Sequence, residues 1–87
     1  MSWSESFPDE QVRIINALYN AWQVLPTGIG LHEEELSKQA SLELSDLVKE
    51  VVRLRSKGVV ATGHGSDNDT LGHVWLTEFG RSLREGD

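Results

Sequence analysis

The chain has 87 residues, no cysteine, 38% hydrophobic and 25% charged residues, and a formal net charge of −6 at pH 7. This length allows one small domain, and the composition excludes a disordered chain, a disulfide framework and a thiolate metal site. No apolar run is long enough to span a membrane and no signal peptide is recognisable, so we expect a single cytoplasmic domain over residues 1–87.

The N-terminal part predicts a loose arm followed by one amphipathic helix. Residues 1–5 have no periodic pattern, and Ser6 is placed to cap the helix, with Asp9 at the capping-box position. Apolar residues then recur at spacings of three and four, which predicts about four helical turns. The residues expected in the buried stripe of this helix are Val12, Ile15, Leu18, Trp22 and Leu25.

Residues 33–57 predict a helix-turn-helix. His32 takes the N-cap position of the first helix, whose opening glutamates suit the positive end of a helix dipole. Ser41 to Glu43 form the turn, and Gly58 is placed to stop the second helix, residues 44–57. The residues expected to face the core are Leu36, Ala40, Leu47, Val51 and Leu54.

Residues 59–76 predict a β-hairpin wing. Val59 to Thr62 and His73 to Leu76 have strand character, and the segment between them is rich in turn residues. If the neighbours of Trp75 point inward, strand alternation places Trp75 outward. Thr77 is expected to cap a last helix. The predicted fold is therefore α+β, mainly α: a winged helix-turn-helix with three to four helices and a β-hairpin wing.

Two blocks of sequence follow a known family pattern. In the first, a Glu35-Leu36 pair opens the motif and Lys57-Gly58-Val59-Val60 closes it. The second is Leu76-Thr77-Glu78-Phe79-Gly80-Arg81-Ser82-Leu83. With the core positions between them, they make roughly residues 12–85 resemble the winged-helix domains of MarR-type and PadR-type transcriptional regulators. The resemblance implies that helix 44–57 enters a major groove of double-stranded DNA, often as part of a homodimer on paired half-sites.

The basic residues that could contact DNA are few. Residues 47–58 hold four bases against one acid, Glu50, and form the only positive stretch. The wing has no arginine and instead carries Asp67 and Asp69, which would repel phosphates. An alternative interpretation makes these bases ordinary solvated charges paired with Glu50 and Asp46. The residues predicted to contact DNA are Lys38, Ser45, Lys49, Arg53 and Arg55.

A second hypothesis is a winged helix that binds protein and not DNA. Apolar residues recur every four positions on helix 44–57, next to its core stripe, where a DNA-reading helix should be polar. Exposed tryptophans are frequent interface anchors. The surface for a protein partner, or for a second copy of the chain, would use Leu44, Val48, Val52, Trp75 and Trp3.

Other chemistry has weaker support in the sequence. Asp67, Asp69, Gly72 and Glu78 overlap the spacing of a calcium loop, but its fifth position is Leu71, which cannot coordinate. His64 and His73 match no compact zinc pattern. The Gly, Asp and Asn residues of the hairpin tip are typical of a turn, which accounts for them without a metal. No catalytic motif is present. We therefore expect no enzyme activity, no cofactor and no metal.

Overall fold

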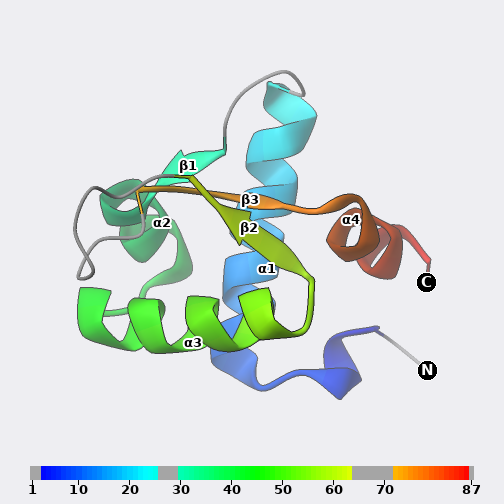
Figure 1. Ribbon diagram of the computed structural model, residues 1–87, viewed down its shortest axis with the longest axis horizontal. Coiled ribbons are helices and arrows are strands. Elements are labelled where there is room, and N and C mark those ends of the chain that lie inside the picture. Colours follow the sequence, from blue (N-terminus) through cyan, green and yellow to red (C-terminus); the bar gives the residue numbers. More distant parts are fainter. Residues whose placement is uncertain (1–2, 26–29, 64–71, 87) are drawn as a thin grey trace.

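The computed structural model describes residues 3–25, 30–63 and 72–86. It is mainly helical, with one three-stranded antiparallel sheet in the order β1-β3-β2 (Figure 1). This architecture confirms the predicted α+β winged-helix fold. The elements are η1 (Trp3–Ser6), α1 (Asp9–Val24), β1 (Leu31–His32), α2 (Glu33–Ala40), α3 (Leu44–Ser56), β2 (Val60–Thr62), β3 (His73–Leu76) and α4 (Glu78–Glu85).

The start of the chain differs from the prediction. The N-cap of α1 is Pro8, and no side chain caps this helix, so the expected cap at Ser6 is wrong. Ser6 instead ends η1, a short 3-10 helix, so the arm is not loose from Trp3 onward. The Trp3 ring lies 6.1 Å from the Phe7 ring, and the Arg84 guanidinium lies 5.5 Å from the Trp3 ring. These contacts place η1 beside α4.

The buried stripe of α1 is displaced from the predicted one. Ile15 and Leu18 are buried as expected, but Val12 and Trp22 are only partly buried and Leu25 is 61% exposed. The C-terminal end of α1 projects beyond the sheet (Figure 1), and Leu25 follows this end as its C-cap. The buried residues of α1 are Gln11, Ile14, Ile15, Ala17, Leu18 and Tyr19.

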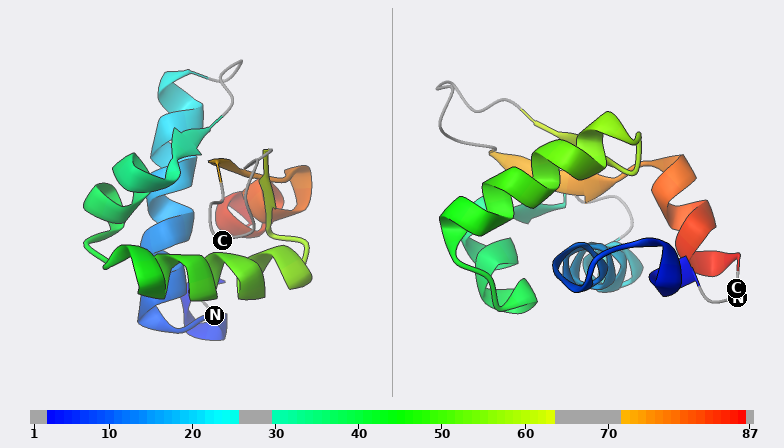
Figure 2. Two further views of the ribbon diagram at one scale, coloured as in Figure 1. Left: turned by 60° about the vertical axis from the view of Figure 1, so that its left-hand side comes forward. Right: turned by 90° about the horizontal axis from the view of Figure 1, so that it is seen from below.

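The helix-turn-helix forms as predicted. The His32 ring caps α2, because its Nδ1 accepts a hydrogen bond of 3.3 Å from the Glu34 amide. Ser41 ends α2 in the left-handed conformation, with φ of 56°, and the next helix, α3, crosses α1 (Figure 2). The five predicted core residues of this motif are at most 1% exposed: Leu36, Ala40, Leu47, Val51 and Leu54.

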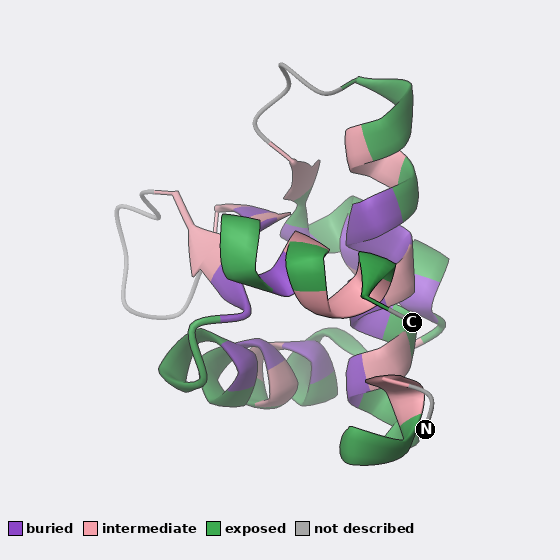
Figure 3. Ribbon diagram, turned by 90° about the vertical axis from the view of Figure 1, so that its right-hand side faces the viewer, coloured by how far each residue is buried: buried purple, intermediate pink, exposed green. Residues whose placement is uncertain are grey.

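The sheet supports the wing and the last helix. Val74 and Leu76 are buried and Trp75 is partly exposed, as alternation predicts; β2 begins at Val60, one residue later than expected. Thr77 caps α4 as predicted: its Oγ1 accepts from the Gly80 amide at 3.0 Å. Buried residues gather on the inner sides of α1 and α3 (Figure 3). None of the helices in the described ranges is long and apolar enough to cross a membrane.

Candidate nucleic-acid interface

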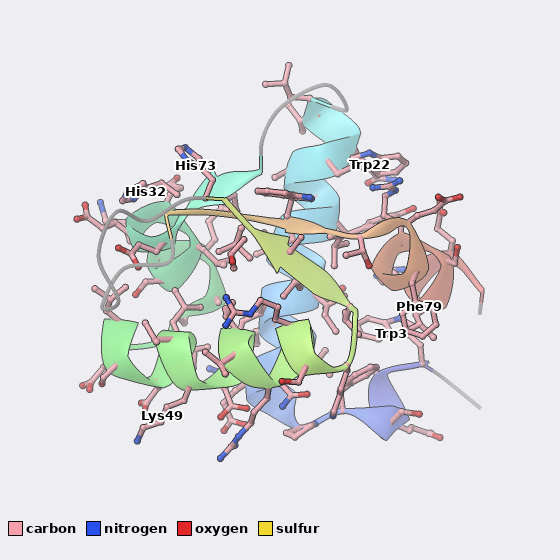
Figure 4. All side chains as sticks on the ribbon, in the orientation of Figure 1. Trp3, Trp22, His32, Lys49, His73 and Phe79 are labelled. Atoms are coloured by element: carbon pink, nitrogen blue, oxygen red, sulfur yellow. The ribbon has the colours of Figure 1, made fainter. Side chains whose placement is uncertain are left out.

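The outer side of α3 is the surface that the DNA-binding prediction requires. One side of this helix packs into the core through Leu47, Val51 and Leu54. The helical period therefore turns Ser45 and Lys49 to the opposite side, where both are exposed. Figure 4 shows Lys49 pointing away from the domain. The 13 residues of α3 thus present one continuous exposed face to a ligand.

Arg53 shares this face but is held by an acidic neighbour. Its Nη1 lies 2.9 Å from Glu50 Oε2, an ion pair one turn apart on α3. The Glu50 side chain is only 13% exposed, and its other oxygen accepts 2.9 Å from Nε2 of the buried Gln11 in α1. Gln11 thereby fixes the carboxylate, and the carboxylate fixes Arg53. This pairing is the one that the alternative interpretation of the basic residues predicted.

Two other bases of the positive stretch are used inside the fold. Arg55 Nη1 donates to Thr62 Oγ1 at 3.1 Å, so this guanidinium is directed to β2 and away from the outer face of α3. Lys57 Nζ lies 3.5 Å from Gln11 Oε1 and 5.1 Å from the centre of the Phe7 ring. Among the four bases of residues 47–58, Lys49 alone has no side-chain partner within the described part of the chain.

The surroundings of α3 are acidic at its N-terminal end. Lys38 is exposed on α2, one element earlier, and it too has no side-chain partner among the described residues. Glu34, Glu35 and Asp46 are also exposed. The two aspartates predicted in the wing tip, Asp67 and Asp69, lie outside the described residues. The positive area therefore consists of Lys38, Lys49 and, when released from its carboxylate, Arg53.

The predicted protein-binding residues do not form one surface. Leu44 and Val52 are 43% and 40% exposed on α3, and Val48 between them packs partly against the core. Trp75 lines a separate groove of about 560 Å³ whose described lining comes from α1, α2, β1, β3, α4, Leu25 and Gly30 and contains no residue of α3. Trp3 lies in a third place, between Phe7 and Arg84.

The groove itself was not predicted. Trp22, Leu31 and Trp75 form part of its lining, and the Arg81 guanidinium lies 5.0 Å from the centre of the Trp22 ring. Val24 and Leu25 at the end of α1 also line it; Val24 is 84% exposed. The adjacent apolar residues Val24 and Leu25 were the sequence signal for this groove, but periodicity assigned Leu25 to the core.

No cluster of three or more His, Cys, Asp or Glu side chains suited to a metal ion occurs within residues 3–25, 30–63 and 72–86. In the calcium-like spacing noted above, Asp67 and Asp69 lie outside these ranges. Within them, Glu78 is exposed in the first turn of α4, where its place in the Leu-Thr-Glu block already accounts for it.

Comparison with known proteins identifies the fold. The sequence matches no protein-family model and no curated protein. A MarR family transcriptional regulator from Silicibacter pomeroyi DSS superposes with a TM-score of 0.71 at 20% identity, covering 95% of this chain and 51% of that one. A mutant of MepR from S. aureus superposes with a TM-score of 0.72 at 19% identity, covering 95% and 57%. The chain has a MarR-like winged-helix fold and spans just over half the length of each neighbour.

Proposed function

We propose that this MarR-like domain is a transcriptional regulator that binds double-stranded DNA through the outer face of α3. The observation that supports this most directly is that face itself: a solvent-exposed helix side that carries Ser45 and Lys49, a lysine with no side-chain partner among the residues that the structure describes. A major groove about 12 Å wide admits one α-helix. The named activity of the S. pomeroyi neighbour, transcriptional regulation, agrees with this assignment.

Side chains at different positions of this surface would make different contacts with DNA. Ser45, in the first turn of α3, and Lys49, one turn later, face the groove floor and can donate hydrogen bonds to base edges. Lys38 lies at a flank and contacts phosphate, and Arg53 would add a second such contact once Glu50 releases it. Arg55 contributes by joining α3 to β2 through Thr62, and it makes no phosphate contact in this arrangement.

Binding of this kind should be weak and sensitive to salt. Two cations, Lys38 and Lys49, are available to neutralise phosphate charge while Glu50 holds Arg53, which gives a slope of log K against log salt of about −1.8. The affinity should then fall roughly 12-fold between 50 mM and 200 mM salt. A net charge of −6 adds general repulsion and slows association.

A titration of the isotope-labelled domain with a mixed-sequence duplex at low salt tests the proposal. We expect amide shifts confined to α3 and Lys38 that fade as salt rises, and we expect Lys49→Ala to reduce them. The control is Arg13→Ala, which removes one positive charge from an exposed residue of α1 that is paired with Asp9. Absence of shifts at high DNA excess, or equal losses in the two variants, would contradict the proposal.

The proposal extends to a homodimer that binds two half-sites. The exposed apolar end of α1, with Val24 and Leu25, supports this, because two copies could bury it against each other. Sedimentation measurements over a range of concentration should then show a dimer that Val24→Asp dissociates. A monomer at every concentration would limit the protein to single half-sites.

The second candidate function is a module that binds a protein with a basic surface. It is favoured by the exposure of Leu44 and Val52 on the helix that would otherwise read DNA. The two functions respond differently to substitution. Val52→Asp, at a position that is 40% exposed, should remove binding of a protein partner, whereas Lys49→Ala should leave that binding intact.

A further inference from the structure

Two histidines lie opposite each other where the helix-turn-helix meets the wing. His32 is the last residue of β1 and His73 is the first residue of β3, and they are direct partners in the antiparallel register. Their ring centres are 5.5 Å apart, with the ring planes at 82° (Figure 4). The sequence places them 41 positions apart, so sequence analysis did not pair them.

The backbone pattern brings these two side chains to the same face of the sheet. The Glu33 amide donates to the Gly72 carbonyl, so the pair next to the histidines is a hydrogen-bonded one. In an antiparallel ladder the two pair types alternate, so His32 and His73 form a non-hydrogen-bonded pair, the type with the closer side chains.

We propose that His32 and His73 together bind one Zn²⁺ ion, with water completing its coordination. A tetrahedral Zn²⁺ with Zn–N bonds of about 2.0–2.1 Å holds two imidazole centres roughly 5 Å apart. The observed separation of the two ring centres, 5.5 Å, is close to this value. His32 is exposed and His73 partly exposed, so an ion can reach both from solvent.

The local charge favours a cation. Glu34 and Glu35, both exposed, begin the helix that His32 caps. Described residues supply two ligands and not three, so this site would be open and of moderate affinity, unlike a closed structural zinc site. The site does not depend on DNA binding by α3.

Ion binding should be coupled to the first turn of α2. His32 Nδ1 accepts from the Glu34 amide at 3.3 Å. A metal at Nδ1 takes the lone pair that forms this bond, and a metal at Nε2 leaves the ring proton on Nδ1, facing the Glu34 N–H. Either mode breaks the cap, so the Glu34 amide should report the event.

Titration of the isotope-labelled protein with Zn²⁺, followed by NMR, tests the site. We expect saturable 1:1 binding that shifts both imidazoles and the Glu34 amide. His32→Asn keeps a side-chain oxygen to cap α2 but removes a ligand, and His73→Thr preserves strand preference. Each variant should weaken binding about tenfold or more.

The matched control is His64→Ala, which removes the third histidine of the chain. It should bind Zn²⁺ as tightly as the unaltered protein. Three results would overturn the proposal: no saturable binding at millimolar Zn²⁺, unchanged affinity in His32→Asn, or an equal loss in His64→Ala. The last result would place the ion across the hairpin and not between β1 and β3.

Discussion

Replacing Glu50 by glutamine should strengthen DNA binding by releasing Arg53. In the structure the Glu50 carboxylate holds the Arg53 guanidinium at 2.9 Å and is itself held by Gln11. Glutamine keeps an oxygen that can accept from Gln11 but removes the negative charge. Because Arg53 is 64% exposed, the lost ion pair should cost only about 0–1 kcal/mol of unfolding free energy.

The gain can be estimated from counterion release. One freed cation adds one phosphate contact, which steepens the salt slope by about 0.9. The affinity ratio of variant to unaltered protein should therefore change about threefold between 50 mM and 200 mM salt, with the larger gain at the lower concentration. Fluorescence anisotropy of a labelled duplex at several salt concentrations measures both the affinity and the slope.

A control separates this local effect from total charge. Glu78→Gln makes the same change of charge at an exposed residue of α4, away from α3. We expect it to raise the affinity less and to leave the salt slope unchanged. If the two variants behave alike, or if Glu50→Gln weakens binding, Arg53 is not a phosphate contact and the reasoning fails.

Three further predictions concern contacts of α4 with the rest of the fold. Thr77→Val should lower the unfolding free energy by about 1–3 kcal/mol, because Thr77 Oγ1 both caps α4 and donates to the Gly58 carbonyl at 2.6 Å. Urea denaturation measures this change, and an unchanged midpoint would refute the prediction. Gly80→Ala should destabilise the fold because an added Cβ collides with the Val59 carbonyl, and full stability in a thermal melt would show that the backbone can shift. Burial, as the larger cause, and the hydrogen bond to Glu85 raise the pKa of Tyr19 above its ordinary value of 10.0. The stabilisation contributed by the neutral Tyr19 hydroxyl is therefore complete below pH 10 and is lost as pH rises through the raised pKa of the folded state. Tyr19→Phe should therefore reduce the alkaline loss of stability, and identical pH profiles of the two proteins would contradict this.

The fold could be predicted largely because its signals are local. The cap at Thr77, the turn at Ser41 and the stripe Leu47, Val51 and Leu54 each depend on residues within about one or two helical turns. The stripe of α1 was less well predicted. Periodicity gives a helix an apolar side, but it does not say where the neighbouring elements end, so Leu25 was assigned to a core that does not reach it.

The candidate site could be predicted only as a set of residue types. Sequence identified the bases on helix 44–57, but not which of them would be free. Gln11, 39 positions from Glu50, fixes the carboxylate that holds Arg53, and Thr62 draws Arg55 to the sheet. Trp75 was correctly placed outward, but only the packed structure showed that it lines a groove apart from α3.

By itself, the sequence determined the α-helices, the caps of α2 and α4, the turns and the faces buried in the helix-turn-helix, because these follow from periods and backbone preferences over a few residues. The tertiary structure decided which charges are paired, which apolar residues stay exposed, and that His32 and His73 meet across β1 and β3. These outcomes require segments that are distant in the sequence to be brought together. The free energies of such contacts depend on pairs of residues that only the folded chain makes neighbours.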